Sequence, residues 1–389
     1  MRFDVIVVGG GAVGASVARA ARGLSVAIVA GAGPLPPHPE RSNDPQPFDA
    51  RVYALSPGSV ETLCALKVWD ALPRERLTPV RAMWVAGDSG AHLEFDSYKA
   101  GVAELAWIVE DRVLNAALWN ALAGQDGLEM FVPARCVSLD LGETARLGLS
   151  DGRVLEGDLV VGADGADSFI RSAAGIAVSE KPYGQSAVVA NFRCERAHEN
   201  VAFQWFQAGP VLALLPLPGN RVSMVWSVPD AEAARLVALD RDALGQRVAA
   251  ASNNRLGGLI AETDAQAFAL RRLSAHRMVQ PHVALAGDAA HVVHPLAGQG
   301  LNLGLQDAHS LGAILQSREP VRSSGDLCLL RRYERDRSEA ILTMGSAVHG
   351  LQVLFGTNAM AARRLRNLGL NLTDRLPFLR NALLRHALH

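Results

Sequence analysis

This chain contains several short apolar runs and one longer stretch in which the apolar residues have helical spacing. The segments Phe3–Val8, Leu24–Val29, Leu159–Val161 and Val283–Ala286 are largely apolar, which is typical of strands buried on both faces of a parallel sheet. A helical stretch follows the last of them, and its apolar face comprises Leu301, Leu305, Ala308, Gly312 and Leu315. This arrangement predicts an α/β fold.

The middle of the chain has the pattern of a second, antiparallel sheet. We expect consecutive strands at Val201–Phe206, Val211–Leu217 and Arg221–Ser227. Val80–Phe95 alternates apolar and polar residues around Gly87-Asp88-Ser89-Gly90, which indicates a hairpin that belongs to the same sheet.

Three segments near these strands allow narrower predictions. Val222, Met224 and Trp226 fall on one face of their strand; this face is either an apolar floor under an aromatic ligand or ordinary hydrophobic core. We expect Asp230–Leu270 to be helical and charged, as a solvated cover. Trp107–Arg112 is expected to open a helix.

Composition narrows the class of protein. The 389 residues suggest about two domains, or one large domain with a subdomain. A formal net charge of -1 argues against a general nucleic-acid binder. The four cysteines lack CxxC spacing, which favours reduced structural thiols in a cytosolic protein over disulfides or zinc. The longest uncharged run, Val201–Asn220, is broken by prolines, so we expect a soluble protein, at most peripheral to a membrane.

The first strand leads into a glycine-rich turn. Gly9, Gly11 and Gly14 have GxGxxG spacing and precede an alanine-rich helical stretch, Ala15–Arg22. In such a turn the first glycine allows the bend, the second lets the backbone approach a pyrophosphate, and the third lets helix pack on strand. The pattern therefore predicts a dinucleotide site.

The next strand departs from that pattern. Leu24–Val29 should end in an acid that binds the adenosine ribose, but Ala30 and Gly31 follow it, and the next acid is Glu40. Either another group binds the ribose hydroxyls, or the dinucleotide binds more weakly.

Two further strand ends carry candidate ligand-binding residues. Gly287 and Asp288 follow Val283–Ala286, where open α/β sheets bind ligands, and a carboxylate suits a ligand rich in hydroxyls. The helix that begins near Leu301 would direct its positive end at the ligand, which stabilises nearby negative charge by about 0.3–1 kcal/mol. A reduced, anionic flavin ring fits this description.

The third strand end is Leu159–Val161, which precedes Asp164, Ser168 and Arg171. The carboxylate offers acceptors to hydroxyls, and the arginine offers a planar fork to phosphate. Elsewhere, His291 and His294 lie at i, i+3 spacing, but no further ligands have suitable spacing for zinc. We favour local hydrogen bonding for this pair, and we predict no metal site.

Several stretches resemble one family. GDAAHVVHPLAGQGLNLGLQDA, at 287–308, resembles the second flavin motif of the FAD-dependent aromatic hydroxylases with a para-hydroxybenzoate hydroxylase-like fold, and more narrowly the ubiquinone-biosynthesis hydroxylases. The segments GPVLALLPLPGNRVSMVWS and RNLGLNLTDRLPFLRNAL are similar to the substrate sheet and the end of the same family. The resemblance implies a monooxygenase that hydroxylates the ring of a polyprenylated phenol with FAD, O2 and NAD(P)H as a transient reductant.

The resemblance also implies an organisation. We expect a Rossmann-like FAD-binding domain of the glutathione-reductase type, with an inserted mixed or antiparallel substrate sheet and C-terminal helices. The FAD-binding parts would be 1–75, 101–182 and 273–335, the substrate parts 76–100 and 183–272, and the C-terminal helical region 336–389.

Residue roles follow from the same resemblance. Gly9, Gly11 and Gly14 would face the pyrophosphate, and Gly287 with Asp288 would hold the ribitol. The flavin ring would be lined by the segment that includes Pro295, Gly298, Gln299, Gly300, Leu301 and Asn302. Arg112, Asp164 and Arg171 would complete the grip on the cofactor. No catalytic base is assigned.

Two arginines each have two possible roles. Arg51, in a segment similar to the family's D-x-R motif, is either a flavin or phosphate neighbour or the partner of Asp49 in a surface ion pair. Arg112 either meets the pyrophosphate or pairs with Asp111 or Glu110 in the first helical turn.

The sequence also leads to expectations about partners and about alternative functions. There is no second GxGxxG, so a nicotinamide cofactor would visit a shared surface. The basic C-terminal end would either contact a membrane surface or partner, or cap the FAD domain; the protein would be cytoplasmic, or peripheral to the inner membrane. The rivals are another flavin enzyme, whether oxidase, reductase or halogenase, and an accessory lipid-handling protein that has lost tight FAD binding. A halogenase is disfavoured because Lys67, Lys99 and Lys181 lie outside the motifs.

Overall fold

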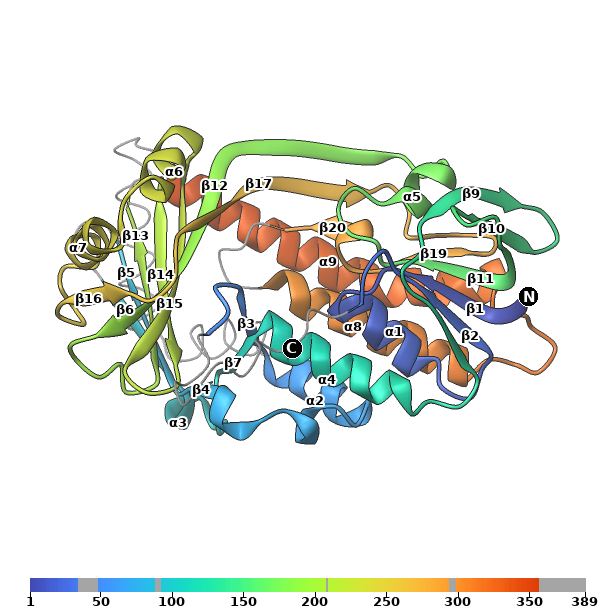
Figure 1. Ribbon diagram of the computed structural model, residues 1–389, viewed down its shortest axis with the longest axis horizontal. Coiled ribbons are helices and arrows are strands. Elements are labelled where there is room, and N and C mark those ends of the chain that lie inside the picture. Colours follow the sequence, from blue (N-terminus) through green and yellow to red (C-terminus); the bar gives the residue numbers. More distant parts are fainter. Residues whose placement is uncertain (34–47, 88–91, 208, 294–298, 357–389) are drawn as a thin grey trace.

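Two lobes joined by a long ribbon make up the molecule (Figure 1). The computed structural model describes residues 1–33, 48–87, 92–207, 209–293 and 299–356. Within these ranges the strands form three sheets. The α/β prediction is confirmed, because parallel strands and helices build one lobe and a mixed sheet builds the other.

The first lobe contains an eight-stranded sheet over the described residues, with the order β18-β19-β11-β1-β2-β8 and with β10 and β9 added beside β11. Its strands are β1 (Arg2–Val8), β2 (Val26–Val29), β8 (Leu128–Phe131), β9 (Cys136–Leu141), β10 (Ala145–Leu149), β11 (Val154–Gly162), β18 (Val279–Gln280) and β19 (Val283–Leu285). The central neighbours β2, β1, β11 and β19 are parallel, so their carboxyl ends meet at one edge. Gly9, Ala163 and Gly287 lie at that edge, each just past a strand.

The second lobe contains nine strands among the described residues, in the order β20-β17-β12-β15-β14-β13-β5-β6, with β16 beside β12. They are β5 (Ala82–Ala86), β6 (His92–Asp96), β12 (Val178–Cys194), β13 (Val201–Phe206), β14 (Val211–Leu217), β15 (Arg221–Pro229), β16 (Leu259–Ala261), β17 (Gln266–Ala275) and β20 (His291–Val292). The predicted hairpin is present as β5 and β6, although its turn lies outside the described residues. The sheet is mixed because β5 is parallel to β13.

The remaining elements are a small sheet, helices and short 3-10 turns. The small sheet has the order β3-β7-β4, from β3 (Val52–Leu55), β7 (Ala106–Glu110) and β4 (Thr78–Val80). The helices are α1 (Ala12–Ala20), α2 (Pro57–Ala65), α3 (Ser97–Ala100), α4 (Asp111–Ala123), α5 (Phe169–Ala173), α6 (Asp230–Val237), α7 (Arg241–Ala251), α8 (Gln299–Gln316) and α9 (Leu327–Gly356). The 3-10 turns are Trp69–Ala71, Arg74–Arg76 and Gly287–Ala289.

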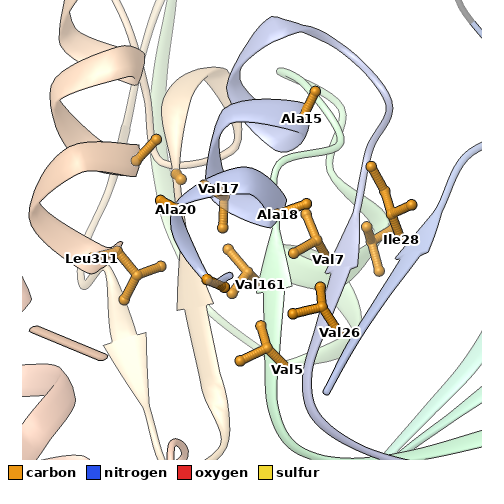
Figure 2. Packing of buried hydrophobic residues seen from close by; sticks show 14 of the residues in the cluster. Val5, Val7, Ala15, Val17, Ala18, Ala20, Val26, Ile28, Val161 and Leu311 are labelled. Carbon is orange, nitrogen blue, oxygen red and sulfur yellow. The ribbon is translucent and has the colours of Figure 1, made fainter. Parts of the chain in front are cut away.

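The core of the first lobe lies around α1, which packs between the parallel sheet and α8 (Figure 2). Val17 and Ala20 of α1 and Leu311 of α8 belong to the same buried cluster as the sheet residues. The buried face of α8 agrees with the predicted helical spacing, because Leu305, Ala308 and Leu315 are fully buried. This packing fixes the start of α1 beside the start of α8.

Two secondary-structure predictions were wrong. Trp107–Glu110 is a strand, β7, and the helix begins only at Asp111; β7 is the central strand between β3 and β4, so pairing on both sides decides its conformation. Within Asp230–Leu270, helix α6 ends at Val237 and helix α7 ends at Ala251, and the strands β16 and β17 follow. The helical propensity around Ala267 and Leu270 is overridden by pairing of β17 along β12.

The face of β15 that contains Val222, Met224 and Trp226 is ordinary core. All three side chains are buried together with Leu236 of α6 and Leu244 of α7. The apolar floor considered for this face is therefore wrong, because helices cover it. The opposite face of the sheet is directed toward the small sheet, since Leu215 packs in a cluster with Val52 and Ala54.

Candidate cofactor-binding site

The glycine-rich turn after β1 is built on two close backbone approaches. A Cβ on Gly9, whose φ is +122°, would lie 2.1 Å from the Ala163 carbonyl oxygen, and a Cβ on Gly14 would lie 2.1 Å from the Gly9 carbonyl oxygen. Gly11 differs, because among the described residues its Cβ would meet nothing within 4 Å. Gly11 is also the N-cap of α1 and makes no side-chain capping bond. The N–H groups at the start of α1 thus have no side-chain cap, which suits an anion such as pyrophosphate.

Trp119 supports this turn from behind. Its Nε1–H donates a 2.9 Å hydrogen bond to the carbonyl oxygen of Gly10. Trp119 comes from α4, and α4 packs against α1. We did not predict this residue, since no local pattern connects a tryptophan to a turn 109 residues away.

The end of β2 contains no acid. Ala30 is 5% exposed and donates its N–H to the Phe131 carbonyl oxygen. A Cβ on Gly31 would meet no described residue within 4 Å. Glu40 lies outside the described residues.

The Gly287–Asp288 turn touches the first glycine motif directly. Gly287 has a φ of +60°, and its Cβ would lie 3.1 Å from both methyl groups of Val13. A Cβ on Gly304 of α8 would lie 2.5 Å from the same side chain. Val13 of α1 is thus in contact with both glycines, so the two motifs predicted from sequence meet in one site.

Asp288 follows Gly287 in this turn. Its side chain is exposed to solvent, yet desolvation by the neighbouring protein raises the pKa of its carboxyl, against the opposing effects of His291, Arg51 and Arg271. The carboxylate of Asp288 is therefore accessible to a ligand while protein groups lie near it. Its oxygens can accept hydrogen bonds from the hydroxyls of a ligand.

Arg51 interacts electrostatically with the Asp288 carboxylate. Desolvation lowers the pKa of its guanidinium, but Tyr53, Asp111, Asp288 and Asp49 raise the pKa on balance. The guanidinium also lies over the Tyr53 ring, 5.5 Å from its centroid. Arg51 therefore places a positive charge within electrostatic range of Asp288.

The raised pKa of Asp288 leads to a pH prediction. The ionised carboxylate is the better acceptor for ligand hydroxyls, so FAD affinity should fall as the pH drops through this raised pKa. We expect the dissociation constant of FAD to rise by up to about tenfold per pH unit below it. Flavin fluorescence titrations between about pH 4.5 and 7.5 measure this effect. The same slope in Asp288→Asn, which cannot ionise, would assign the effect to another group.

Asp164 and Arg171 both make hydrogen bonds to protein groups, and Arg171 does not offer its guanidinium to phosphate as we expected. The two carboxylate oxygens of Asp164 accept hydrogen bonds from the Ser168 hydroxyl (2.5 Å) and from the Ile170 N–H (3.1 Å). Arg171 is 7% exposed, and its guanidinium donates to the carbonyl oxygens of Ala289 (2.9 Å) and Ala166 (2.8 Å). Arg171 thus ties α5 to the turn that contains Asp288, and its fork is directed at carbonyl groups.

Arg112 lies at the edge of the site. It pairs with Asp49 at 3.5 Å, whereas Glu110 binds Arg76 through two 2.7 Å contacts. Neither first-turn partner considered for Arg112 is therefore the one observed. Arg112 and Asp49 line a pocket of about 300 Å³ together with Arg241. Within the described residues, the Asp49 carboxylate has its ion pair with Arg112 and not with Arg51.

The first turn of α8 contains one buried polar residue and three partly exposed residues. Asn302 is 2% exposed; its Oδ1 accepts from the Ser56 N–H and the Ser59 hydroxyl, and its Nδ2 donates to the Ala54 carbonyl oxygen. Asn302 thus attaches α8 to the junction of β3 and α2. Gln299, Gly300 and Leu301 are partly exposed, and a Cβ on Gly300 would meet no described residue within 4 Å. Pro295 and Gly298 lie outside the described residues.

One buried cluster was not predicted from sequence. Asp307 of α8 is fully buried and contacts Gly287, His291 and Arg337. The preference for local hydrogen bonding of His291 agrees with this contact, while His294 lies outside the described residues. No pattern in the sequence connects Asp307 to Arg337.

Other kinds of site were also considered. The four cysteines, all within the described ranges, are free thiols. Among the described residues no group of three or more His, Cys, Asp and Glu side chains could hold a metal ion. No helix in the described part of the chain is long and apolar enough to cross a membrane.

FAD fits the residues that are present. The uncapped start of α1 matches a pyrophosphate, the accessible carboxylate of Asp288 matches the hydroxyls of a ribityl chain, and the partly exposed Gly300 suits close approach of a flat ring. Val13 of α1 contacts both Gly287, which precedes Asp288, and Gly304 of α8, so these elements meet at the carboxyl edge of the parallel sheet.

Comparisons with known proteins agree with this fit. A family model described as "FAD binding domain" matches residues 2–345. The 3-demethoxyubiquinol 3-hydroxylase of Escherichia coli (strain K12) is 35% identical over 392 residues, which cover 99% of this chain and 98% of that protein. Ubiquinone hydroxylase UbiL of Rhodospirillum rubrum is 32% identical over 99% of this chain and 89% of its own length. Among solved structures, PqsL of P. aeruginosa in complex with 2-aminobenzoylacetate has a TM-score of 0.79 and 25% identity, and covers 96% of this chain and 100% of that one.

Proposed function

Since this chain belongs to the FAD-binding domain family, and within it to the ubiquinone-biosynthesis hydroxylases, we propose that it hydroxylates the aromatic ring of a polyprenylated phenol with FAD, O2 and NAD(P)H. The observation that carries this proposal is the similarity along the whole chain to a 3-demethoxyubiquinol 3-hydroxylase. The site supports it, because its α1 terminus and the accessible carboxylate of Asp288 suit two different parts of FAD.

Each part of the site has its own task in this proposal. The N–H groups at the start of α1 bind the pyrophosphate, and Asp288 accepts hydrogen bonds from the ribityl hydroxyls. The first turn of α8, with Gly300 and Leu301, directs its positive end at the flavin ring. Once bound, FAD supplies the redox chemistry, which takes electrons from NAD(P)H and activates O2 for hydroxylation.

The substrate ring is proposed to lie on the sheet face that is directed toward β3. The core face of this sheet is covered by α6 and α7. On the other face Ala213, Leu215 and Val225 are partly exposed, and Leu215 packs toward Ala54, whose carbonyl is bound by Asn302 of α8. An apolar surface beside the start of α8 would hold an aromatic ring and exclude water, as hydroxylation with activated O2 requires.

The reductant and the surroundings are finer parts of the same proposal. NAD(P)H would dock transiently on the surface near the flavin, because the chain contains one GxGxxG motif. Contact with a membrane or partner through the basic C-terminal region is proposed on its sequence alone, since residues 357–389 lie outside the described part.

A second candidate rests on one observation. The absence of an acid at Ala30 favours an accessory lipid-handling protein with weak FAD binding. The residue-level fit of the other features to FAD argues for the enzyme.

The test is spectroscopic and chemical. The purified chain should show a bound-flavin absorption spectrum after loading with FAD. NAD(P)H should bleach this spectrum faster when a prenylated phenol is present, and the phenol should gain one oxygen atom by mass spectrometry. A chain that binds no flavin after loading would support the accessory protein. Bound flavin that is reduced without any oxygenated product would favour an oxidase or reductase.

A further inference from the structure

A buried carboxylate joins three elements directly behind the Gly287–Asp288 turn. Oδ2 of Asp307 accepts a 2.9 Å hydrogen bond from the Gly287 N–H and lies 2.7 Å from Nε2 of His291. Oδ1 accepts a 2.8 Å bond from Nε of Arg337. Asp307 is 0% exposed, His291 3% and Arg337 7%. The cluster therefore connects the turn, β20, α8 and α9 in the interior.

The charges of this cluster decide where its hydrogens lie. Burial alone would raise the pKa of the Asp307 carboxyl, but His291 and Arg337 lower it on balance. The carboxylate is therefore ionised at neutral pH and can only accept, so Nε2 of His291 must carry the hydrogen of their contact. Three N–H groups converge on one anion. Hydrogen bonds to an ionised acceptor are about twice as strong as neutral ones.

Two further residues of α9 attach the strands that precede the turn. Tyr333 of α9 donates its hydroxyl to the carbonyl oxygen of Leu285, at the end of β19. Glu334 accepts a hydrogen bond from the N–H of Met278, just before β18. Arg337 follows one turn later and reaches Asp307. The strand before the turn and the helix after it are thus both attached to the same stretch of α9.

We propose that Asp307, His291 and Arg337 are positioning residues that hold the Gly287–Asp288 turn in its ligand-binding geometry, so that α9 sets the affinity of the site for FAD. Gly287 has a left-handed backbone conformation, and its N–H donates a hydrogen bond to the Asp307 carboxylate. Loss of that anchor would let Asp288, the next residue, move away from its ligand-binding position. The inference rests on the proposed function only in that the turn binds FAD.

A matched control is available on the same two helices. The Ser310 hydroxyl of α8 donates to Asp336 of α9 at 2.6 Å, but this pair does not contact the turn. Removing it weakens the packing of α8 on α9 without touching Asp307. Asp307 itself is a poor choice for substitution, because its loss would leave Arg337 buried without its partner and threaten folding.

The experiment therefore compares His291→Leu, His291→Gln and Ser310→Ala. The amide nitrogen of the glutamine lies about as far from the backbone as Nε2 and keeps the donor to Asp307, whereas leucine removes it. We expect His291→Leu to weaken FAD binding about tenfold by flavin fluorescence titration, which corresponds to one charge-assisted hydrogen bond. His291→Gln should stay within about twofold of the unmodified chain, and Ser310→Ala should bind FAD unchanged even if its melting temperature falls.

The outcomes separate the alternatives. His291→Leu with unchanged FAD affinity would overturn the positioning role, and so would equal weakening in Ser310→Ala, because both results would reduce the cluster to helix packing. Normal FAD binding by the unmodified chain without hydroxylation of any phenol would refute the proposed function and leave this comparison intact. An unmodified chain that binds no FAD would overturn both.

Discussion

Asp288→Ala should leave the purified chain almost without FAD. The carboxylate is accessible at the Gly287–Asp288 turn, and two hydrogen bonds from ribityl hydroxyls to its oxygens would contribute about 1.5–3 kcal/mol each. Their loss raises the dissociation constant of FAD by about a hundredfold or more. The flavin-to-protein ratio after gel filtration, together with a fluorescence titration of the apoprotein, measures this change.

The matched variants separate binding from folding. Asp70→Ala removes an acid whose side chain is 88% exposed and should keep full flavin content. Asp288→Asn keeps one acceptor oxygen, so its affinity should fall between those of the unmodified chain and Asp288→Ala. Normal flavin content in Asp288→Ala would show that the turn does not bind the ribityl chain.

Gly14→Ala should damage folding, and Gly11→Ala should damage binding. The new methyl group at position 14 would lie 2.1 Å from the Gly9 carbonyl oxygen, and backbone on both sides has no side-chain freedom with which to relieve the overlap. We expect the free energy of unfolding to fall by about 3 kcal/mol. Urea unfolding of the apoprotein, followed by circular dichroism, measures this loss.

Gly11→Ala serves as the contrast within the same motif. A Cβ there meets no described residue within 4 Å, so the apoprotein should unfold at the same urea concentration as the unmodified chain. The methyl group would occupy the space in front of α1 that a pyrophosphate needs, and FAD should bind more weakly. If Gly11→Ala bound FAD normally, the pyrophosphate would not lie on α1.

The sequence was informative wherever a local pattern carries the structure. The glycine spacing around Gly11 and the apolar face of α8 could both be predicted, because each depends on neighbours within a few residues. The fit of Asp288 to the edge of the sheet could be predicted for the same reason. The roles of individual site residues stay predictions until they are measured.

The remaining features depend on contacts between distant segments. Trp119 binds Gly10 across 109 residues, and Arg337 reaches Asp307 across 30; no periodicity marks either pair. Arg171 also shows that a local pattern can mislead. Its position after a strand led us to expect a contact with phosphate, but its guanidinium binds the carbonyl groups of Ala289 and Ala166. The strand β17 was missed because its partner β12 decides its conformation.

The strand order of the first lobe has a consequence for the way the chain is made. β1 leaves the ribosome first, yet it pairs with β11, and β11 in turn waits for β19 at Val283–Leu285. Asp288 emerges directly after β19, when every described strand of the second sheet except β20 has been made, and the start of α8 emerges after β20. During synthesis the N-terminal glycine turn therefore exists for most of the time without the segment that faces it. The segments proposed to bind FAD are therefore all present only late in synthesis, so we expect FAD to be captured late in the folding of this lobe.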